Sequence, residues 1–490
     1  MKLIVKKKDD FSNSDVVVIF LTEGYRNNIE KDIPSEFSFI TERVDLSFFM
    51  GKSSEVLFLP FIDFPNIIII GIGKEEEINS ESLRNSSSDI VKICKNKNVK
   101  AVSVLLPLLT KLTQQSILSS IAEGLYLSNY NFDKYKSKED DANKLLDKAF
   151  FYFDTREIAV SILKDIEISC ENTILCRDMI NETSDKTNPV EIAKVAKGLS
   201  KINGITCEVY GRQEIEKMKM GLILAVSRGS VHPPQLVVLK YKGNPKSKKS
   251  IAIVGKGITF DSGGMNLKSS SHIEDMRCDM SGAAACIYTI KAAAEMKIKK
   301  NIFAIIPLCE NMISNTAYRP GDVFYAYNGK SVEIGNTDAE GRLILADALA
   351  YTEEKLKPDY IIDIATLTGA CLVCFGETIA GLLTNNDNLA EIVCKAGEET
   401  GDRAWRLPLY KEFDEEMKSD IADIKNISSN RNAGTIMGAV FLKSFIQKTY
   451  WAHIDIAGTA WYSKQRGYRP KYATGFGVRL FLEMIKGLDF

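Results

Sequence analysis

Strand-length runs of Val, Ile and Leu alternate with helix-forming segments along this 490-residue chain. In its second half the predicted strands are residues 235–241, 251–258, 302–308, 360–366 and 453–457. The predicted helices that separate or follow them are residues 281–296, 340–355, 389–397 and 436–448. Such alternation predicts a mostly parallel sheet flanked by helices, because parallel strands need long crossover connections. We therefore assign the chain to the α/β class.

The N-terminal part repeats this alternation on a smaller scale. Its predicted strands are residues 16–21, 55–59, 66–73 and 99–106, and its predicted helices are residues 80–96 and 114–127. A stretch rich in Lys and Asp at residues 129–147 is typical of a surface loop. Because 490 residues exceed one typical core, we predict two domains. They are a smaller N-terminal α/β domain over residues 1–160 and a larger C-terminal domain over residues 181–490, joined by a helix over residues 161–180.

The charge balance and the apolar runs limit the partners of the chain. The formal net charge is −1, from 63 basic and 64 acidic residues. This balance argues against nucleic acid or an anionic membrane surface as a partner. The first ten residues contain no apolar core of a signal peptide, and the longest apolar runs have the length of strands rather than of bilayer spans. We expect a cytoplasmic protein.

Cysteine and histidine usage limits the kinds of metal site. The ten cysteines lie mostly inside apolar segments, which is typical of reduced, buried thiols. Cys371 and Cys374 have the spacing of a redox or zinc half-site, but no second pair or nearby His completes it. We predict that both are buried side chains. The three histidines form no HExxH pattern, so a metal would depend mainly on oxygen ligands.

The motif from Asn336 to Leu343 holds Asp338, Glu340 and Arg342 within five positions. Side chains two residues apart do not share a face of a helix. They can nevertheless converge on one point in a turn that enters a helix, and gathered carboxylates suit a hard metal ion. By itself the motif is equally compatible with a helix N-terminus that carries favourable acidic residues.

Two further turns of the same α/β unit carry acidic groups. The first follows the strand at residues 251–258, contains Lys256 and Asp261, and is followed by Lys268. It lacks the Lys-Ser/Thr ending of a phosphate loop. The second holds Asp279 directly before a predicted helix. Taken singly, the lysines are compatible with solvated side chains, Asp261 with a turn residue and Asp279 with a helix cap.

The three turns together favour a different interpretation. In a doubly wound sheet such turns can face one crevice beyond the carboxyl ends of the strands. Four converging carboxylates (Asp261, Asp279, Asp338 and Glu340) would repel one another unless cations neutralised them. Two divalent ions and a few cationic side chains would do so, which is the charge arrangement of a two-metal hydrolytic site.

These segments resemble the cytosolic leucyl aminopeptidases, the two-metal family also called aminopeptidase A in bacteria. The similar segments are GKGITFDSGG at 255–264, MRCDMSGAA at 276–284, NTDAEGRL at 336–343, DIATLTGA at 363–370 and NFDKYK at 131–136. NTDAEGRL is the signature of that family. The resemblance spans most of the chain and is weakest over the first hundred residues. It implies that residues 181–490 form the catalytic peptidase domain.

The resemblance implies a role for each matching position. Lys256, Asp261, Asp279 and Glu340 resemble the ligands of a tighter metal ion. Asp261, Asp338 and Glu340 resemble the ligands of a more exchangeable one, so that Asp261 and Glu340 would bridge both. Lys268 and Arg342 resemble the catalytic pair. Residues of the substrate pocket would be Lys268, Met276, Thr366 and Leu367.

The implied activity is release of the N-terminal residue from peptides, with Leu and similar apolar residues preferred. The metals would share a bridging hydroxide, and Lys268 would polarise the scissile carbonyl. Arg342 would hold a bicarbonate that shuttles the proton, since a guanidinium suits a planar oxyanion. Oxygen ligands plus one amine admit Zn, Mn, Co or Mg. The resemblance also implies a homohexamer built as a dimer of trimers.

Two other functions are compatible with parts of the sequence. A two-metal carboxylate site also suits a phosphoesterase, although the chain has no phosphate loop. Some bacterial members of this family also bind DNA, but the near-zero net charge gives no support for a DNA-binding regulator.

Overall fold

The computed structural model describes residues 1–6, 11, 13–25, 33, 37–62, 64–137, 145–153, 155–430 and 432–489. The chain divides into two units. The first consists of Met1–Glu171 and Lys464–Lys471, and the second of Asn172–Ser463 and Tyr472–Phe490. The long helix α5 (Arg156–Asn181) contains the point of division. Residues 138–144 of the predicted surface loop lie outside the described part of the chain.

The first unit contains a sheet of six described strands in the order β1-β6-β5-β2-β4-β3. All neighbours are parallel except β3, which pairs antiparallel with β4. The strands are β1 (Lys2–Lys6), β2 (Val16–Leu21), β3 (Val56–Leu59), β4 (Asn66–Gly71), β5 (Ala101–Val104) and β6 (Lys148–Tyr152). The described helices besides α5 are α2 (Phe39–Arg43), α3 (Ser80–Lys97) and α4 (Gln114–Ser128), with the 3-10 turn η3 (Glu75–Glu77). The mixed, mostly parallel pairing confirms the predicted α/β class for this part.

The second unit contains a larger sheet, whose path through the described residues is β16-β15-β18-β14-β9-β11-β8-β7, with β10 paired to β11. Its centre is parallel, from β18 through β14 and β9 to β11. The strands are β7 (Ile205–Tyr210), β8 (Gln235–Lys242), β9 (Ser250–Gly255), β10 (Gly257–Asp261), β11 (Asn301–Asn311), β14 (Tyr360–Ala365), β15 (Ala380–Thr384), β16 (Ala404–Arg406) and β18 (Tyr450–Asp455). A three-stranded sheet contains β12 (Val323–Tyr325), β13 (Ser331–Glu333) and β17 (Ile424–Lys425). A two-stranded sheet contains β19 (Trp461–Tyr462) and β20 (Tyr472–Ala473).

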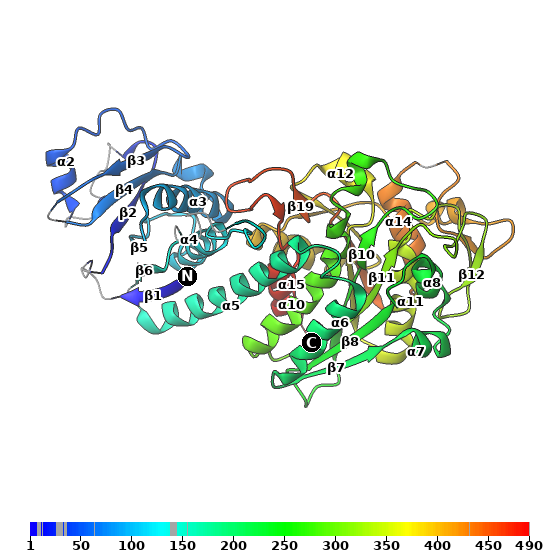
Figure 1. The fold of residues 1–490 in the computed structure, drawn as a ribbon. Coiled ribbons are helices and arrows are strands. Elements are labelled where there is room, and N and C mark those ends of the chain that lie inside the picture. Colours follow the sequence, from blue (N-terminus) through cyan, green and yellow to red (C-terminus); the bar gives the residue numbers. More distant parts are fainter. Residues whose placement is uncertain are drawn as a thin grey trace. The chain divides into compact units, whose positions relative to one another are not determined.

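Helices flank this sheet (Figure 1). Both α10 and α11 contact the central strands β9, β11 and β14. The α-helices are α6 (Pro189–Gly198), α7 (Arg212–Lys217), α8 (Gly221–Val226), α9 (Ser270–Ile273), α10 (Ser281–Glu295), α11 (Gly341–Tyr351), α12 (Gly369–Phe375), α13 (Asp387–Thr400), α14 (Gly434–Lys443) and α15 (Val478–Gly487). A π-helical turn (Thr352–Leu356) follows α11, and 3-10 turns are η5 (Leu199–Lys201), η6 (Ser227–Gly229), η7 (Met276–Met280) and η9 (Lys411–Met417). The larger C-terminal α/β unit agrees with the predicted fold class.

The predicted strand at residues 251–258 is two strands in the structure. β9 ends at Gly255 and β10 begins at Gly257, so Lys256 stands between them. The Lys256 backbone donates to the carbonyl of Ile364 on β14, whereas β10 pairs with β11 through an irregular register. The prediction was wrong here because one continuous apolar run does not reveal where a strand changes its neighbour.

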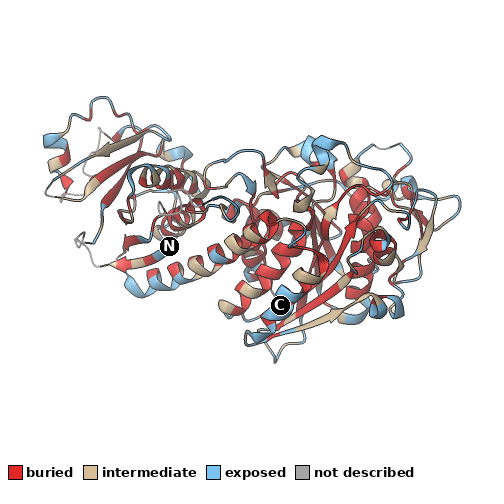
Figure 2. Ribbon diagram, viewed as in Figure 1, coloured by how far each residue is buried: buried red, intermediate tan, exposed pale blue. Residues whose placement is uncertain are grey.

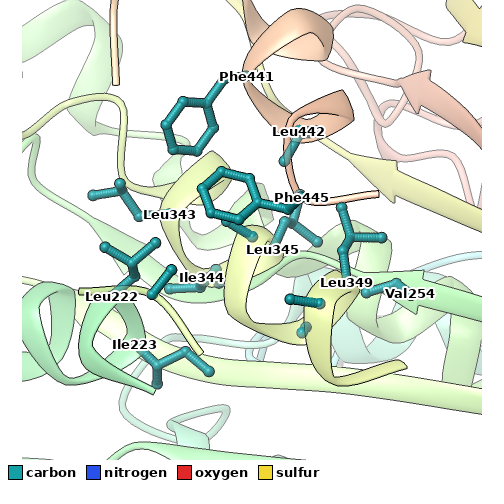
Figure 3. Packing of buried hydrophobic residues seen from close by; sticks show 14 of the residues in the cluster. Leu222, Ile223, Val254, Leu343, Ile344, Leu345, Leu349, Phe441, Leu442 and Phe445 are labelled. Atoms are coloured by element: carbon teal, nitrogen blue, oxygen red, sulfur yellow. The ribbon is translucent and has the colours of Figure 1, made fainter. Parts of the chain in front are cut away.

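The core beneath α11 fixes that helix in place. Buried residues of α8, α11, α14 and the sheet form one apolar cluster. Figure 2 shows that buried residues are concentrated in the interior of each unit. Figure 3 shows Leu343 and Leu345 of α11 with Leu222 of α8 and Phe441 of α14 in this cluster. Burial of such side chains contributes about 1.5–3 kcal/mol each. The first turn of α11 is therefore held on a rigid support.

The cysteines agree with only part of the prediction. All ten are free, and Cys371 is buried, but Cys374 is exposed. The prediction that both are buried was wrong for Cys374, because the short helix α12 is largely exposed and Cys371 is its one buried residue. No helix among the described residues is long and apolar enough to span a membrane.

Candidate active site

The acidic side chains of the three turns meet beyond the central strands of the larger sheet. Asp261 is the last residue of β10, Asp279 lies in η7, and Glu340 directly precedes α11. Carboxylate oxygens of Asp261, Asp338 and Glu340 all lie within 4.8 Å of one another. Asp279 does not cap α10, since no side chain caps that helix. The spacing of two between Asp338 and Glu340 lets both reach the cluster from one turn.

Two lysines pair with these carboxylates. Lys256 Nζ lies 2.7 Å from Asp279 Oδ1 and 2.9 Å from Glu340 Oε1. Lys268 Nζ lies 2.8 Å from Asp261 Oδ2 and 2.5 Å from Asp338 Oδ1. The Lys256 side chain is 3% exposed and that of Lys268 15% exposed. Neither is a solvated surface lysine, so that alternative was wrong for both.

Burial and mutual repulsion shift the pKa values of these groups. Burial raises the pKa of Asp261 to about 6; the Glu340 charge adds to the shift and Lys268 opposes it. Burial likewise raises the pKa of Asp279 above its usual value, although Lys256 opposes the shift. Burial acts to lower the pKa of Lys256, but Asp279 and Glu340 outweigh it and the pKa is raised. The lysines therefore act as cations that hold the carboxylates together.

The donor set fits divalent metal ions. Four carboxylates face two ammonium groups, which leaves a formal surplus of two negative charges. Asp261, Asp279 and Glu340 are buried, and the Asp338 side chain is 33% exposed. Asp279 Oδ2 and Glu340 Oε2 are buried and have no hydrogen-bond partner among the described residues. A buried carboxylate oxygen without a partner is costly. Oxygen donors that are left available in this way are the ligands that hard divalent cations prefer.

Arg342 lies in the first turn of α11 and is buried. Its Nη1 donates to the carbonyl of Asn426 at 2.8 Å, while its Nε has no partner in the described part of the chain. Burial lowers the pKa of Arg342 to about 10, although Glu340 and Asp455 oppose the shift. A cavity of about 180 Å³ adjoins it, lined by Asn336, Arg342, Ile427, Ser428, Gly434 and Met437. Arg342 is therefore not an exposed helical charge.

The candidate substrate residues come from two segments. Met276 begins η7, three positions before Asp279, and is half-buried. Thr366 and Leu367 follow β14 and are also half-buried. The Thr366 hydroxyl donates to Asp279 Oδ1 at 2.7 Å, and its carbonyl accepts from Lys256 Nζ at 2.8 Å. This loop therefore contacts the acidic cluster directly.

Sequence reasoning missed two buried residues that hold these loops. The Asn426 side chain accepts from Gly335 N at 2.7 Å and donates to the carbonyl of Asn336 at 2.7 Å. Asp455 accepts from Leu367 N at 3.2 Å and from the Thr368 hydroxyl at 2.6 Å. A carboxylate inside an apolar strand is a signal that could have indicated Asp455. Asn426 stands in a loop without any local motif.

Known proteins resemble this chain over both structural units. The catalytic-domain model of the cytosol aminopeptidase family matches residues 174–482, and its N-terminal-domain model matches residues 38–139. A probable cytosol aminopeptidase of Protochlamydia amoebophila (strain UWE25) is 44% identical over 447 residues, covering 90% of this chain and 89% of that protein. One from Geobacter sp. (strain M21) is 40% identical over 422 residues, covering 86% and 85%. The structure of the bottromycin maturation enzyme BotP, which is also known in complex with Mn, has a TM-score of 0.84 and 29% identity, covering 96% of this chain and 99% of that one.

Proposed function

This chain belongs to the cytosol aminopeptidase family of metal-dependent exopeptidases. We propose that it hydrolyses peptides at its acidic cluster and releases leucine and similar apolar residues from their N-termini. The observation that carries this proposal is the cluster itself. Carboxylate oxygens of three residues lie within 4.8 Å of one another, and Lys256 and Lys268 flank them. The substrate must have a free N-terminus in this proposal, because the site would recognise its amine.

Two ions, each held by part of the cluster, would occupy the site. Lys256, Asp261, Asp279 and Glu340 would hold one, and Asp261, Asp338 and Glu340 the other. Lys256, an ammonium in the absence of metal, would bind as a neutral amine, because an adjacent divalent ion lowers its pKa. When bound, the ions supply Lewis acidity and lower the pKa of a water molecule. Zn and Mn are the favoured identities, with Co and Mg as alternatives, because the donors are oxygens and one amine.

Lys268 is proposed as the electrophilic side chain. It is the more exposed of the two lysines and lies between Asp261 and Asp338. Burial acts to lower its pKa, but Asp261 and Glu340 outweigh it and the pKa is raised. The side chain is therefore an ammonium that donates to the scissile carbonyl oxygen and stabilises the oxyanion as its charge develops.

Arg342 is proposed to hold a bicarbonate that moves the proton. The guanidinium is planar and presents several donors, which suits a planar oxyanion. Its Nε, which has no partner among the described residues, and the adjoining cavity of about 180 Å³ support this role. The anion would accept a proton from the attacking water and return it to the leaving amine.

The last two parts of the proposal are the pocket for the first side chain of the peptide and the oligomeric state of the protein. Met276, Thr366 and Leu367 would form the pocket for the first side chain, together with Lys268. A cytoplasmic homohexamer, built as a dimer of trimers, would carry the activity. Light scattering after size exclusion measures the oligomer directly, and a monomer would contradict that part.

The decisive experiment measures hydrolysis of a panel of aminoacyl p-nitroanilides after metal removal and restoration with one metal at a time. We expect activity that depends on added metal and is highest for leucine. The metal-restored protein is assayed in parallel with p-nitrophenyl phosphate and in a DNA gel shift at moderate salt. Phosphate hydrolysis without peptide hydrolysis would refute the proposal. Salt-sensitive DNA binding would indicate an additional function.

A further inference from the structure

Asn311 is the last residue of β11, and its side chain lies fully buried between two of the acidic turns. Its Nδ2 donates to Asp261 Oδ1 at 2.8 Å and to the carbonyl of Thr337 at 3.0 Å. Thr337 directly precedes Asp338. One amide group thus links the turn that carries Asp261 to the turn that carries Asp338 and Glu340.

The orientation of this amide is set by its partners. A carboxylate and a backbone carbonyl only accept hydrogen bonds, so the NH₂ end of Asn311 must face Asp261 and Thr337. Asn311 Oδ1 is then buried without a partner among the described residues. Gly264, at φ +63°, lies against this oxygen, since a Cβ there would approach Asn311 Oδ1 to 2.9 Å. An unpaired buried acceptor needs an explanation. Here the amide is oriented so that its NH₂ group donates to Asp261, and this orientation leaves Oδ1 unpaired among the described residues.

The backbone reinforces the same connection. The Asn311 carbonyl accepts from Ser262 N at 2.9 Å and from Ser262 Oγ at 2.8 Å. The Thr337 hydroxyl donates to the carbonyl of Gly263 at 2.6 Å. The turn after β10 is therefore bound on both sides, to the end of β11 and to the turn before α11.

Asn311 and Lys268 contact different oxygens of Asp261. Lys268 contacts Oδ2 with a full positive charge, whereas Asn311 contacts Oδ1 with a neutral donor. A neutral donor orients a carboxylate without neutralising it. Hydrogen-bonding partners of this kind orient metal ligands, and their loss lowers metal affinity by about 10–100-fold.

We propose that Asn311 is a positioning residue that holds Asp261 and the Asp338 turn in the arrangement that binds the metal ions. This inference rests on the proposed function, because it takes Asp261 as a metal ligand. The side chain acts through Asp261 and Thr337 and does not touch the substrate.

The test is calorimetric titration of Mn²⁺ into the metal-stripped full-length protein. Asn311→Ala is expected to bind Mn²⁺ about 10–100-fold more weakly than the wild type. Asn311→Leu keeps most of the side-chain volume and removes the donor, so it is expected to lose affinity to a similar extent. Circular dichroism establishes that each variant is folded before titration.

The matched control is Asn301→Ala at the other end of the same strand. Asn301 Nδ2 donates to the carbonyls of Ser247 and Lys249 at 3.0 and 3.1 Å, and Asn301 Oδ1 accepts from Asn244 N at 3.1 Å. This variant also loses side-chain hydrogen bonds of β11, but it is expected to bind Mn²⁺ like the wild type.

Each outcome bears on the inference. Wild-type affinity in Asn311→Ala would overturn it, since the side chain would then be dispensable for metal binding. Wild-type affinity in Asn311→Leu alone would also overturn it, since packing and not the donor would then matter. An equal loss in Asn301→Ala would also overturn it, as any weakening of β11 would suffice. If the wild type itself binds no Mn²⁺ and hydrolyses no peptide, the proposed function fails too. If the wild type does both and Asn311→Ala is unchanged, only the role of Asn311 is refuted.

Discussion

Two groups of buried carboxylates in the larger unit differ in how their oxygens are satisfied. Asp347 and Asp363, the structural carboxylates, have a donor on each oxygen. Asp347 accepts from Tyr327 N at 2.7 Å on one oxygen and from Leu222 N and Ile223 N at 3.0 Å on the other. Asp363 contacts His453 Nδ1 at 2.5 Å and accepts from Trp451 Nε1 at 2.7 Å.

The site carboxylates, which are Asp261, Asp279, Asp338 and Glu340, are arranged differently. Asp279 and Glu340 each keep one buried oxygen without a partner in the described part of the chain, and all four share two lysines. Burial with complete hydrogen bonding stabilises a fold, whereas burial with unpaired oxygens costs stability and leaves donors for a ligand. The difference separates Asp347 and Asp363 from Asp279 and Glu340. Asp261 has a donor on each oxygen and is linked to the site carboxylates through its ion pair with Lys268.

The largest effect is expected from a site carboxylate. Glu340→Ala should reduce hydrolysis of leucine p-nitroanilide to background and lower the metal content measured by elemental analysis, and Asp338→Asn should do the same. The free energy of unfolding without metal should fall less than in the structural variant below, because removal of Glu340 breaks its contact with Lys256 Nζ but also relieves its repulsion of Asp261 and Asp279. Turnover like that of the wild type in either variant would remove the residue from the proposed site.

A structural carboxylate should show the reverse behaviour. Asp363→Ala leaves the buried His453 ring and the Trp451 indole N–H without their acceptor. We expect a loss of about 3–5 kcal/mol in the free energy of unfolding, measured in urea. Mn²⁺ affinity of the folded variant should stay close to that of the wild type. A selective loss of metal binding at unchanged stability would break the distinction between the two groups.

Lys268→Ala tests the cationic partner of the site carboxylates. If Lys268 supplies one contact to the oxyanion, its removal should lower kcat roughly 100-fold, or about 2.7 kcal/mol. Metal content should be retained, since Asp261 and Asp338 remain. Steady-state kinetics and elemental analysis on the same preparation measure both effects. An unchanged kcat would exclude Lys268 from the chemical step.

The smallest effect is expected from Thr366→Val, which removes the hydroxyl that donates to Asp279 Oδ1. One hydrogen bond of this kind contributes about 0.5–1.5 kcal/mol. Mn²⁺ affinity should fall by the corresponding factor, roughly twofold to tenfold, while the carbonyl of residue 366 still accepts from Lys256. Thr352→Val, at a buried threonine that donates to the carbonyl of Ala348, serves as the control and should leave affinity unchanged.

Local pattern was sufficient for much of the fold. The predicted helix at residues 281–296 corresponds to α10 and the predicted strand at residues 16–21 to β2, because apolar periodicity and turn residues are properties of short segments. The predicted helix at residues 340–355 instead ends as α11 at Tyr351 and continues as a π-helical turn. The short strands β15 and β16 were missed, since their signal is weak and their pairing is distant in sequence.

The sequence by itself determined the chemistry available to this protein. It placed acidic residues and lysines in three turns of an α/β unit and carried the motifs of the family. Only the tertiary structure decided which oxygens stay unpaired, that Lys256 links Asp279 to Glu340, and that Asn311 connects two turns. These are contacts between residues far apart in the chain. No local pattern encodes them, because they depend on how the strands align and where each strand ends.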